Sequence, residues 1–185
     1  MRDYFQEAIT AALSEQDLRP EADTTTYLVE LLCRFARSGP QLALPLAPAL
    51  ARAKSCPDAS QSIRQLRQVG DQSLYVAGFF SDSLRRSDLD QSYYSQIGST
   101  AYQHLSRSLR LGCQPTRLVI VFSELGTSFD SFVELLSLVK LQGVEPTDEE
   151  LGQLYARWLE TGDDTAARRL RRAGMVVLER PRTKQ

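Results

Sequence analysis

Histidine and cysteine are scarce in this chain, and their scarcity excludes several kinds of site. The 185 residues contain one histidine, His104, and three cysteines with no Cys-x-x-Cys pair. Histidine-rich zinc sites, two-histidine iron sites and di-iron bundles all need more histidine. The widely spaced Cys33, Cys56 and Cys113 are typical of reduced thiols in a cytosolic protein. We therefore expect no metal and no cofactor.

Glycine-rich phosphate-binding motifs and long apolar runs are also absent. The chain has neither Gly-x-Gly-x-x-Gly nor Gly-x-x-x-x-Gly-Lys-Ser/Thr, and Gly126-Thr127-Ser128 lacks the second glycine of a nucleophile elbow. No run of about 18 apolar residues occurs, and Asp3 and Glu7 leave no apolar signal segment. These absences predict a cytoplasmic location, no membrane partner and no familiar catalytic residue.

Leucine and alanine, by contrast, are abundant. The chain has 27 Leu and 17 Ala against 4 Ile and 10 Val, a balance that favours helices because β-branched side chains are stiff there. The net charge of −1 does not indicate a surface built wholly for nucleic acid or anionic lipid. We predict an all-α fold, a single-domain bundle of six to eight helices over residues 1–180, with a flexible tail at residues 181–185.

Apolar spacing places these helices along the chain. Helices are expected over 3–14, 23–38 (capped by the Asp23-Thr-Thr-Thr run), 46–54 and 60–70. The Gly70-Asp71 step should interrupt the last of these, with Asp71 capping a new helix that runs to Leu84. A partner helix over 92–110 then completes a tight helical hairpin, because Ala77, Gly78, Gly98 and Ala101 let two backbones approach closely.

The second half of the chain predicts a long central helix. Apolar residues recur every three or four positions from Pro115 to Gln142, which keeps one face apolar throughout. Thr147 and Glu150 form a capping box for the next helix, which ends near Gly162. A last helix is expected over residues 164–173.

The hairpin also holds the candidate ligand-binding residues. Backbone breaks and polar groups gather there in an otherwise apolar setting, and tyrosines with polar tips either line a pocket or simply pack. His104, at the edge of an apolar stripe, is a partly exposed helix residue, a heme ligand or a proton shuttle. The candidate residues are Gly70, Asp71, Tyr93, Tyr94 and His104.

Charge is asymmetric near the C-terminus. Residues 145–164 carry seven acidic residues against Arg157, whereas residues 165–185 carry six arginines and Lys184 against Glu179. Such a basic segment can contact phosphates or an acidic protein partner, or it can pair with the adjacent acidic segment. The candidate partner-binding or phosphate-binding residues are Arg168, Arg169, Arg171 and Arg172.

The hairpin residues also carry a resemblance. Arg67-x-x-Gly70-Asp71-x-x-Leu74-x-Val76-x-Gly78-Phe79-Phe80, followed by Tyr93-Tyr94-x-x-x-Gly98-x-x-Ala101-Tyr102, resembles a bacterial family of helical proteins with no assigned function. The pieces Tyr27-Leu28-x-x-Leu31-Leu32 and Leu154-Tyr155-x-Arg157-Trp158-Leu159 extend the similarity. The resemblance implies that the hairpin defines the family, and it brings no activity or cofactor.

Three functions remain open from the sequence. We favour a non-catalytic cytosolic protein-interaction or adaptor module that binds a protein partner or itself. The first alternative is a small-molecule-binding protein, or an enzyme with an unfamiliar site, in the 70–104 hairpin. The second is nucleic-acid binding through the arginine-rich helix, which the adjacent acidic segment and the lack of interleaved aromatic residues disfavour.

Overall fold

Helices make up the secondary structure of the part of the chain that the computed structural model describes, which is residues 1–39, 45–80, 91–112, 115–142, 148–161, 166–167, 170–171 and 175. The all-α prediction is confirmed, and this part contains no strand and no helix with the length and apolar composition needed to cross a membrane. The helices are α1 (Arg2–Gln16), α2 (Ala22–Ser38), α3 (Leu46–Ser55), α4 (Ala59–Phe79), α6 (Gln91–Leu111), α7 (Thr116–Thr127), α8 (Phe129–Gln142) and α9 (Asp148–Thr161).

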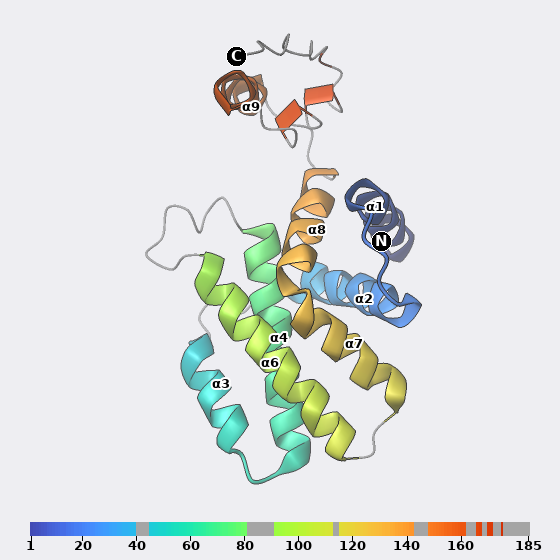
Figure 1. The fold of residues 1–185 in the computed structure, drawn as a ribbon, viewed down its shortest axis with the longest axis vertical. Coiled ribbons are helices and arrows are strands. Elements are labelled where there is room, and N and C mark those ends of the chain that lie inside the picture. The colour runs from blue at the N-terminus through green and yellow to red at the C-terminus, as the bar shows by residue number, and fades with distance from the viewer. Residues whose placement is uncertain are drawn as a thin grey trace, which may run out of the picture. The chain divides into compact units, whose positions relative to one another are not determined.

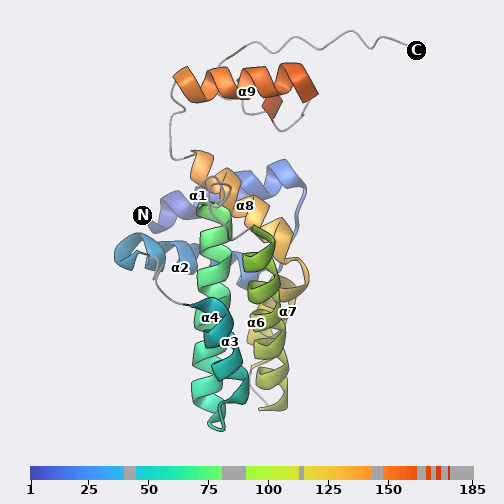
Figure 2. The same cartoon turned by 90° about the vertical axis from the view of Figure 1, so that its left-hand side faces the viewer.

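The sequence predicts one helical domain over residues 1–180. The structure divides into two compact units, Met1–Lys140 and Leu141–Gln185. In the first unit α4, α6 and α7 pack side by side, α3 lies along α4, and α2 contacts both α4 and α7 (Figures 1 and 2). In the second unit, buried Ala167 and Leu170 pack with the half-buried Leu151, Trp158 and Met175. The expected tail lies outside the described residues.

Close approach of backbones at glycine shapes the first unit. A Cβ atom on Gly98 of α6 would overlap the ring of Phe129 at the start of α8, and it would lie 2.8 Å from Ser73 Cβ of α4. A Cβ atom on Gly78 would lie 2.6 Å from Leu136 Cβ. The expected hairpin is therefore present as α4 and α6, and its small residues also admit side chains of α8.

One expected helix boundary is wrong. Asp71 does not begin a new helix, because α4 runs unbroken from Ala59 to Phe79. The carboxylate that caps α4 belongs to Asp58, which accepts hydrogen bonds from the amides of Ser60 and Gln61. Gly70 stays helical, and Asp71 falls in the buried middle of the helix. The expected extension to Leu84 lies outside the described residues.

The long helix expected over 115–142 is in fact two helices. Residue Ser128 separates α7 from α8, and Figure 1 shows the chain changing direction there. Gly126, Thr127 and Ser128 are weak helix formers. The Gly126 carbonyl accepts a hydrogen bond from Gln103 Nε2 of α6, which fixes the end of α7 against that helix.

The bounds of α1, α3, α6 and α9 agree with expectation to within a few residues. The expected cap of α2, however, is wrong. The side chain of Asp23 does not cap α2, which begins after Glu21. The backbone amide of Glu21 instead donates to both carboxylate oxygens of Glu124 on α7, at 3.2 and 3.3 Å. Thr147 and most of the expected helix at 164–173 lie outside the described residues.

Replacing Gly98 with alanine should destabilise the first unit by about 1–3 kcal/mol, because the added methyl group overpacks the crossing of three helices. Urea unfolding followed by far-ultraviolet circular dichroism measures this loss. The matched control is Gly152→Ala in α9, where a Cβ atom has no neighbour within 4 Å. This control should unfold at the wild-type midpoint or slightly above it, and equal midpoints for Gly98→Ala and the wild type would contradict the proposed crossing.

Candidate functional site

A charged side chain, Asp71, lies in the middle of the core. Its residue is only 2 % exposed, and its neighbours on α4 include the buried Leu74 and Val69. A carboxylate in this setting loses its hydration, which is costly unless charged or hydrogen-bonding partners replace the water. The partners of Asp71 therefore identify the most polar site in the described core.

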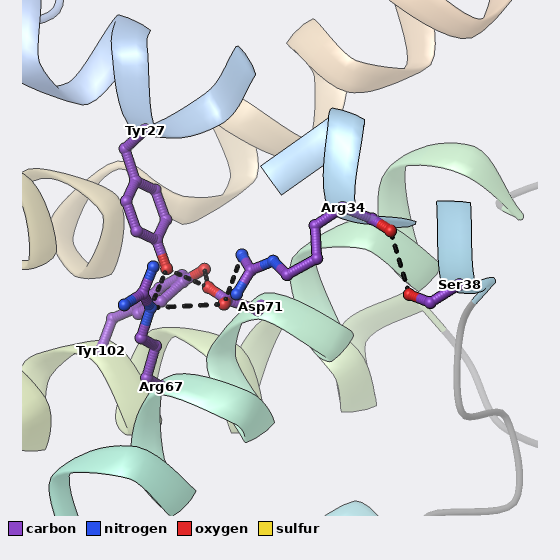
Figure 3. A network of polar contacts seen from close by, with 6 residues as sticks. All are labelled: Tyr27, Arg34, Ser38, Arg67, Asp71 and Tyr102. Carbon is purple, nitrogen blue, oxygen red and sulfur yellow. Dashed lines mark hydrogen bonds and ion pairs between the residues drawn. The ribbon is translucent and has the colours of Figure 1, made fainter. Parts of the chain in front are cut away.

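Two buried tyrosine hydroxyls donate hydrogen bonds to one oxygen of this carboxylate. Asp71 Oδ1 accepts a hydrogen bond of 2.5 Å from the Tyr27 hydroxyl of α2 and one of 2.8 Å from the Tyr102 hydroxyl of α6. Figure 3 shows both rings pointing at Asp71 from their separate helices. Since Asp71 itself belongs to α4, one carboxylate oxygen connects three helices.

Two arginines form ion pairs with the other carboxylate oxygen. Arg34 Nη2 of α2 lies 2.9 Å from Asp71 Oδ2, and Arg67 Nε of α4 lies 3.7 Å from it. Arg67 Nε also donates to the Tyr27 hydroxyl at 3.0 Å, and its guanidinium lies 5.0 Å from the centre of the Tyr27 ring. Both arginine side chains are nearly half exposed, so solvent screens their attraction to the carboxylate.

We call Tyr27, Arg34, Arg67, Asp71 and Tyr102 the Asp71 cluster. Helical spacing explains how the sequence assembles it. Tyr27 and Arg34 are seven residues apart and so lie on one face of α2, and Arg67 precedes Asp71 by one turn of α4. Gly70 of α4 leaves space for the Tyr102 ring of α6, because a Cβ atom on Gly70 would lie 2.6 Å from Tyr102 Cε1.

Burial shifts the pKa values in this cluster. It raises the pKa of Asp71, and Arg34, the two phenols and Arg67 act in the opposite direction. The pKa values of Tyr27 and Tyr102 lie well above the ordinary value, first because both phenols are buried and next because a phenolate would face the Asp71 carboxylate. The phenols therefore remain hydrogen-bond donors over a wide pH range.

A row of aromatic rings continues from the Asp71 cluster. The rings of Phe35 and Tyr75 stack at 4.3 Å, those of Tyr75 and Phe79 stack at 4.8 Å, and Phe80 meets Tyr75 edge-on at 6.0 Å. All four residues are partly exposed, and the Arg34 guanidinium lies 5.9 Å from the Phe35 ring. We call Phe35, Tyr75, Phe79 and Phe80 the aromatic face.

The residues expected to form a ligand site lie in separate surroundings. Gly70 and Asp71 belong to the Asp71 cluster, whereas Tyr93 and Tyr94 pack against a core group that contains Leu46, Ala49, Val69, Ile97 and Ala101. The Tyr93 hydroxyl accepts a hydrogen bond from the Ala47 amide at 3.3 Å.

His104 is partly exposed, and its pKa is lowered by burial and by the cations Lys54 and Arg107. Arg171 is exposed, while Arg168, Arg169 and Arg172 lie outside the described side chains.

The sequence interpretation did not assign a site role to Tyr27, Arg34, Arg67 or Tyr102. One signal was present, because Asp71 lies between Val69 and Leu74 in an apolar stretch, where a charged residue implies a buried partner. Tyr27 and Tyr102 are separated from Asp71 by 44 and 31 residues in the sequence, so local spacing does not identify them as its partners.

No protein-family model matches the chain, and neither a curated protein nor a solved structure shows significant similarity to it. The resemblance to a bacterial helical family therefore stays a prediction. Among the described residues, no group of three or more histidine, cysteine or acidic side chains is arranged to hold a metal ion. The described thiols of Cys33 and Cys56 are free.

Two substitutions of Asp71 should separate its charge from its hydrogen bonds. Asp71→Asn keeps an acceptor for both phenols and should cost about 1–2 kcal/mol of unfolding free energy. Asp71→Ala leaves two buried hydroxyls without their acceptor and should cost about 3–5 kcal/mol. Urea unfolding measures both losses. The exposed Asp17→Asn is the control and should leave stability unchanged, and equal costs for the two Asp71 variants would show that the phenol hydrogen bonds contribute nothing.

The buried phenols should make the protein sensitive to alkaline pH. Because the folded-state pKa values of Tyr27 and Tyr102 are raised, their contribution to stability is complete below pH about 10 and is lost as pH rises above it. Unfolding free energy measured across this range should fall less steeply for Tyr102→Phe than for the wild type. The exposed Tyr4→Phe should keep the wild-type slope, and a Tyr102→Phe slope that matches it would contradict the assignment.

Proposed function

We propose that this protein is a non-catalytic protein-interaction or adaptor module that acts in the cytoplasm of a bacterium and binds a protein partner or a second copy of itself. The observation that carries the proposal is the aromatic face. Aromatic rings and arginine are the residue types that contribute most to protein interfaces. Here Phe35, Tyr75, Phe79 and Phe80 remain partly exposed with Arg34 beside them.

The Asp71 cluster supports this proposal by fixing the aromatic face in place. Arg34 pairs with Asp71 and also lies over Phe35, and Tyr75 follows Asp71 by one turn of α4. The rings therefore project from two helices that the buried carboxylate ties together. Side chains that are ordered before binding lose less conformational entropy in a complex.

The same cluster argues against the alternative of an enzyme or small-molecule site in the hairpin. Asp71 is the candidate residue with the most strongly altered surroundings, and its carboxylate already faces two hydroxyls and two guanidinium groups of the protein. Tyr93 and Tyr94 pack elsewhere, against side chains of α3 and α4. The ligand-site alternative therefore has less support than the interaction module. Nucleic-acid binding through the arginine-rich segment stays a prediction.

The proposal predicts an association that depends on the aromatic face. Light scattering over a range of concentrations detects self-association, and affinity capture followed by reconstitution with the purified partner detects another protein. Tyr75→Ser should weaken the association at least about fivefold, because truncation of an interface aromatic residue costs more than about 1 kcal/mol of binding free energy.

Tyr4→Ser is the matched control, since Tyr4 is an exposed aromatic residue of α1 that pairs only with Phe5 among the described rings. It should associate as the wild type does. Circular dichroism verifies that both variants fold. A chain that remains monomeric and reconstitutes with no partner would refute the interaction module, as would equal effects of the two substitutions.

A further inference from the structure

The charges of the first unit are unevenly distributed, although the whole chain is nearly neutral. The end of α3, the start of α4, the end of α6 and the start of α7 lie at one end of this unit (Figures 1 and 2). Six exposed cations belong to these helix ends: Arg52, Lys54, Arg64, Arg107, Arg110 and Arg117. We call this set the basic end.

Acidic residues hardly offset these cations. Within residues 45–67, 103–112 and 115–120 the only acidic residue is Asp58, whose carboxylate is used as the cap of α4. None of the six cations forms an ion pair with another described residue. The influence of Lys54 and Arg107 on His104 places cations of α3 and α6 near the same imidazole. The basic end therefore gathers six positive charges with one acidic residue, Asp58, among them.

Helix dipoles explain only part of this arrangement. Arg52, Lys54 and Arg110 lie in the last turns of α3 and α6, where a cation complements the partial negative charge of the helix end. Arg117 instead lies in the first turn of α7, where the dipole disfavours a cation, and Pro115 supplies no side-chain cap there. Stability of the separate helices therefore does not account for Arg117.

Exposed aliphatic side chains accompany the cations. Leu111, the last residue of α6, is 87 % exposed, and Leu118 and Ile120 of α7 are also exposed. Aliphatic side chains next to arginine contribute nothing to contact with a phosphate backbone, which disfavours a nucleic acid. Arginine also contributes to protein interfaces, but the exposed large apolar residues of the basic end include no aromatic ring to anchor a protein partner beside the arginines.

We propose that the basic end docks onto an anionic phospholipid surface. The arginines and Lys54 would lie among the headgroups, and Leu111 would enter the boundary between headgroups and acyl chains, as the apolar residues of interfacial helices do. Each cation near such a surface contributes about fivefold to the partition coefficient. The cytoplasmic leaflet carries the required negative charge. This inference departs from the expectation, drawn from the sequence, of no membrane partner, and it requires no membrane-spanning helix. It concerns a surface other than the aromatic face and does not depend on the proposed protein partner.

Sedimentation with lipid vesicles tests the inference on the full-length chain. The wild type should bind equimolar phosphatidylcholine–phosphatidylserine vesicles at low salt, bind pure phosphatidylcholine much less, and dissociate as salt is raised. The double variant Arg107→Glu, Arg110→Glu should bind the mixed vesicles at least about twentyfold more weakly. Leu111→Ser should also weaken binding, and by a similar factor at high and low salt, because it removes only an apolar contact.

The matched control changes net charge equally at other positions. Arg2→Glu combined with Arg19→Glu alters two exposed arginines outside the basic end and should retain wild-type binding. Equal losses in the two double variants would show a response to net charge alone and overturn the inference. Failure of the wild type to bind mixed vesicles would also overturn it, as would retention of duplex DNA or an acidic peptide in place of vesicles.

Discussion

The first unit depends on a single buried carboxylate shared among three helices. Asp71 of α4 accepts hydrogen bonds from Tyr27 of α2 and Tyr102 of α6, and Arg34 and Arg67 balance its charge where solvent reaches the cluster. A buried ion pair is not an efficient source of stability. It fixes the relative positions of α2, α4 and α6 instead, because the hydroxyls of Tyr27 and Tyr102 must both reach one carboxylate oxygen at hydrogen-bonding distance.

This constraint links the core to the surface. Arg34 is held by Asp71 and in turn lies beside Phe35, so the position of the aromatic face follows from the buried charge. The basic end lies at helix termini that carry no such buried charge, and its cations are exposed. The molecule thus presents two chemically different surfaces, one aromatic and one cationic with exposed aliphatic residues, on the same group of helices.

Helix content and most helix positions follow from apolar periodicity, because burial of one face is a local property of the sequence. The wrong boundaries have a common cause. Gly70-Asp71 and the Thr-rich start of α2 contain residues that favour helix ends, but tertiary contacts override this preference. The Tyr102 ring covers Gly70, and Glu124 of α7 supplies the acceptor at the start of α2. Around Ser128, Gly126 and Phe129 both contact α6, and α7 ends where periodicity alone would continue the helix.

The sequence by itself determined an all-helical chain, the approximate bounds of its helices and the importance of the segment around Gly70 and Asp71. Only the tertiary structure decided that Tyr27, Arg34 and Tyr102 are the partners of Asp71, and that the candidates Tyr93, Tyr94 and His104 are not. Only the tertiary structure, likewise, gathers six cations at one end of a unit whose chain has a net charge of −1. The physical reason is that burial and charge separation depend on distances in space, and residues far apart in the sequence set those distances.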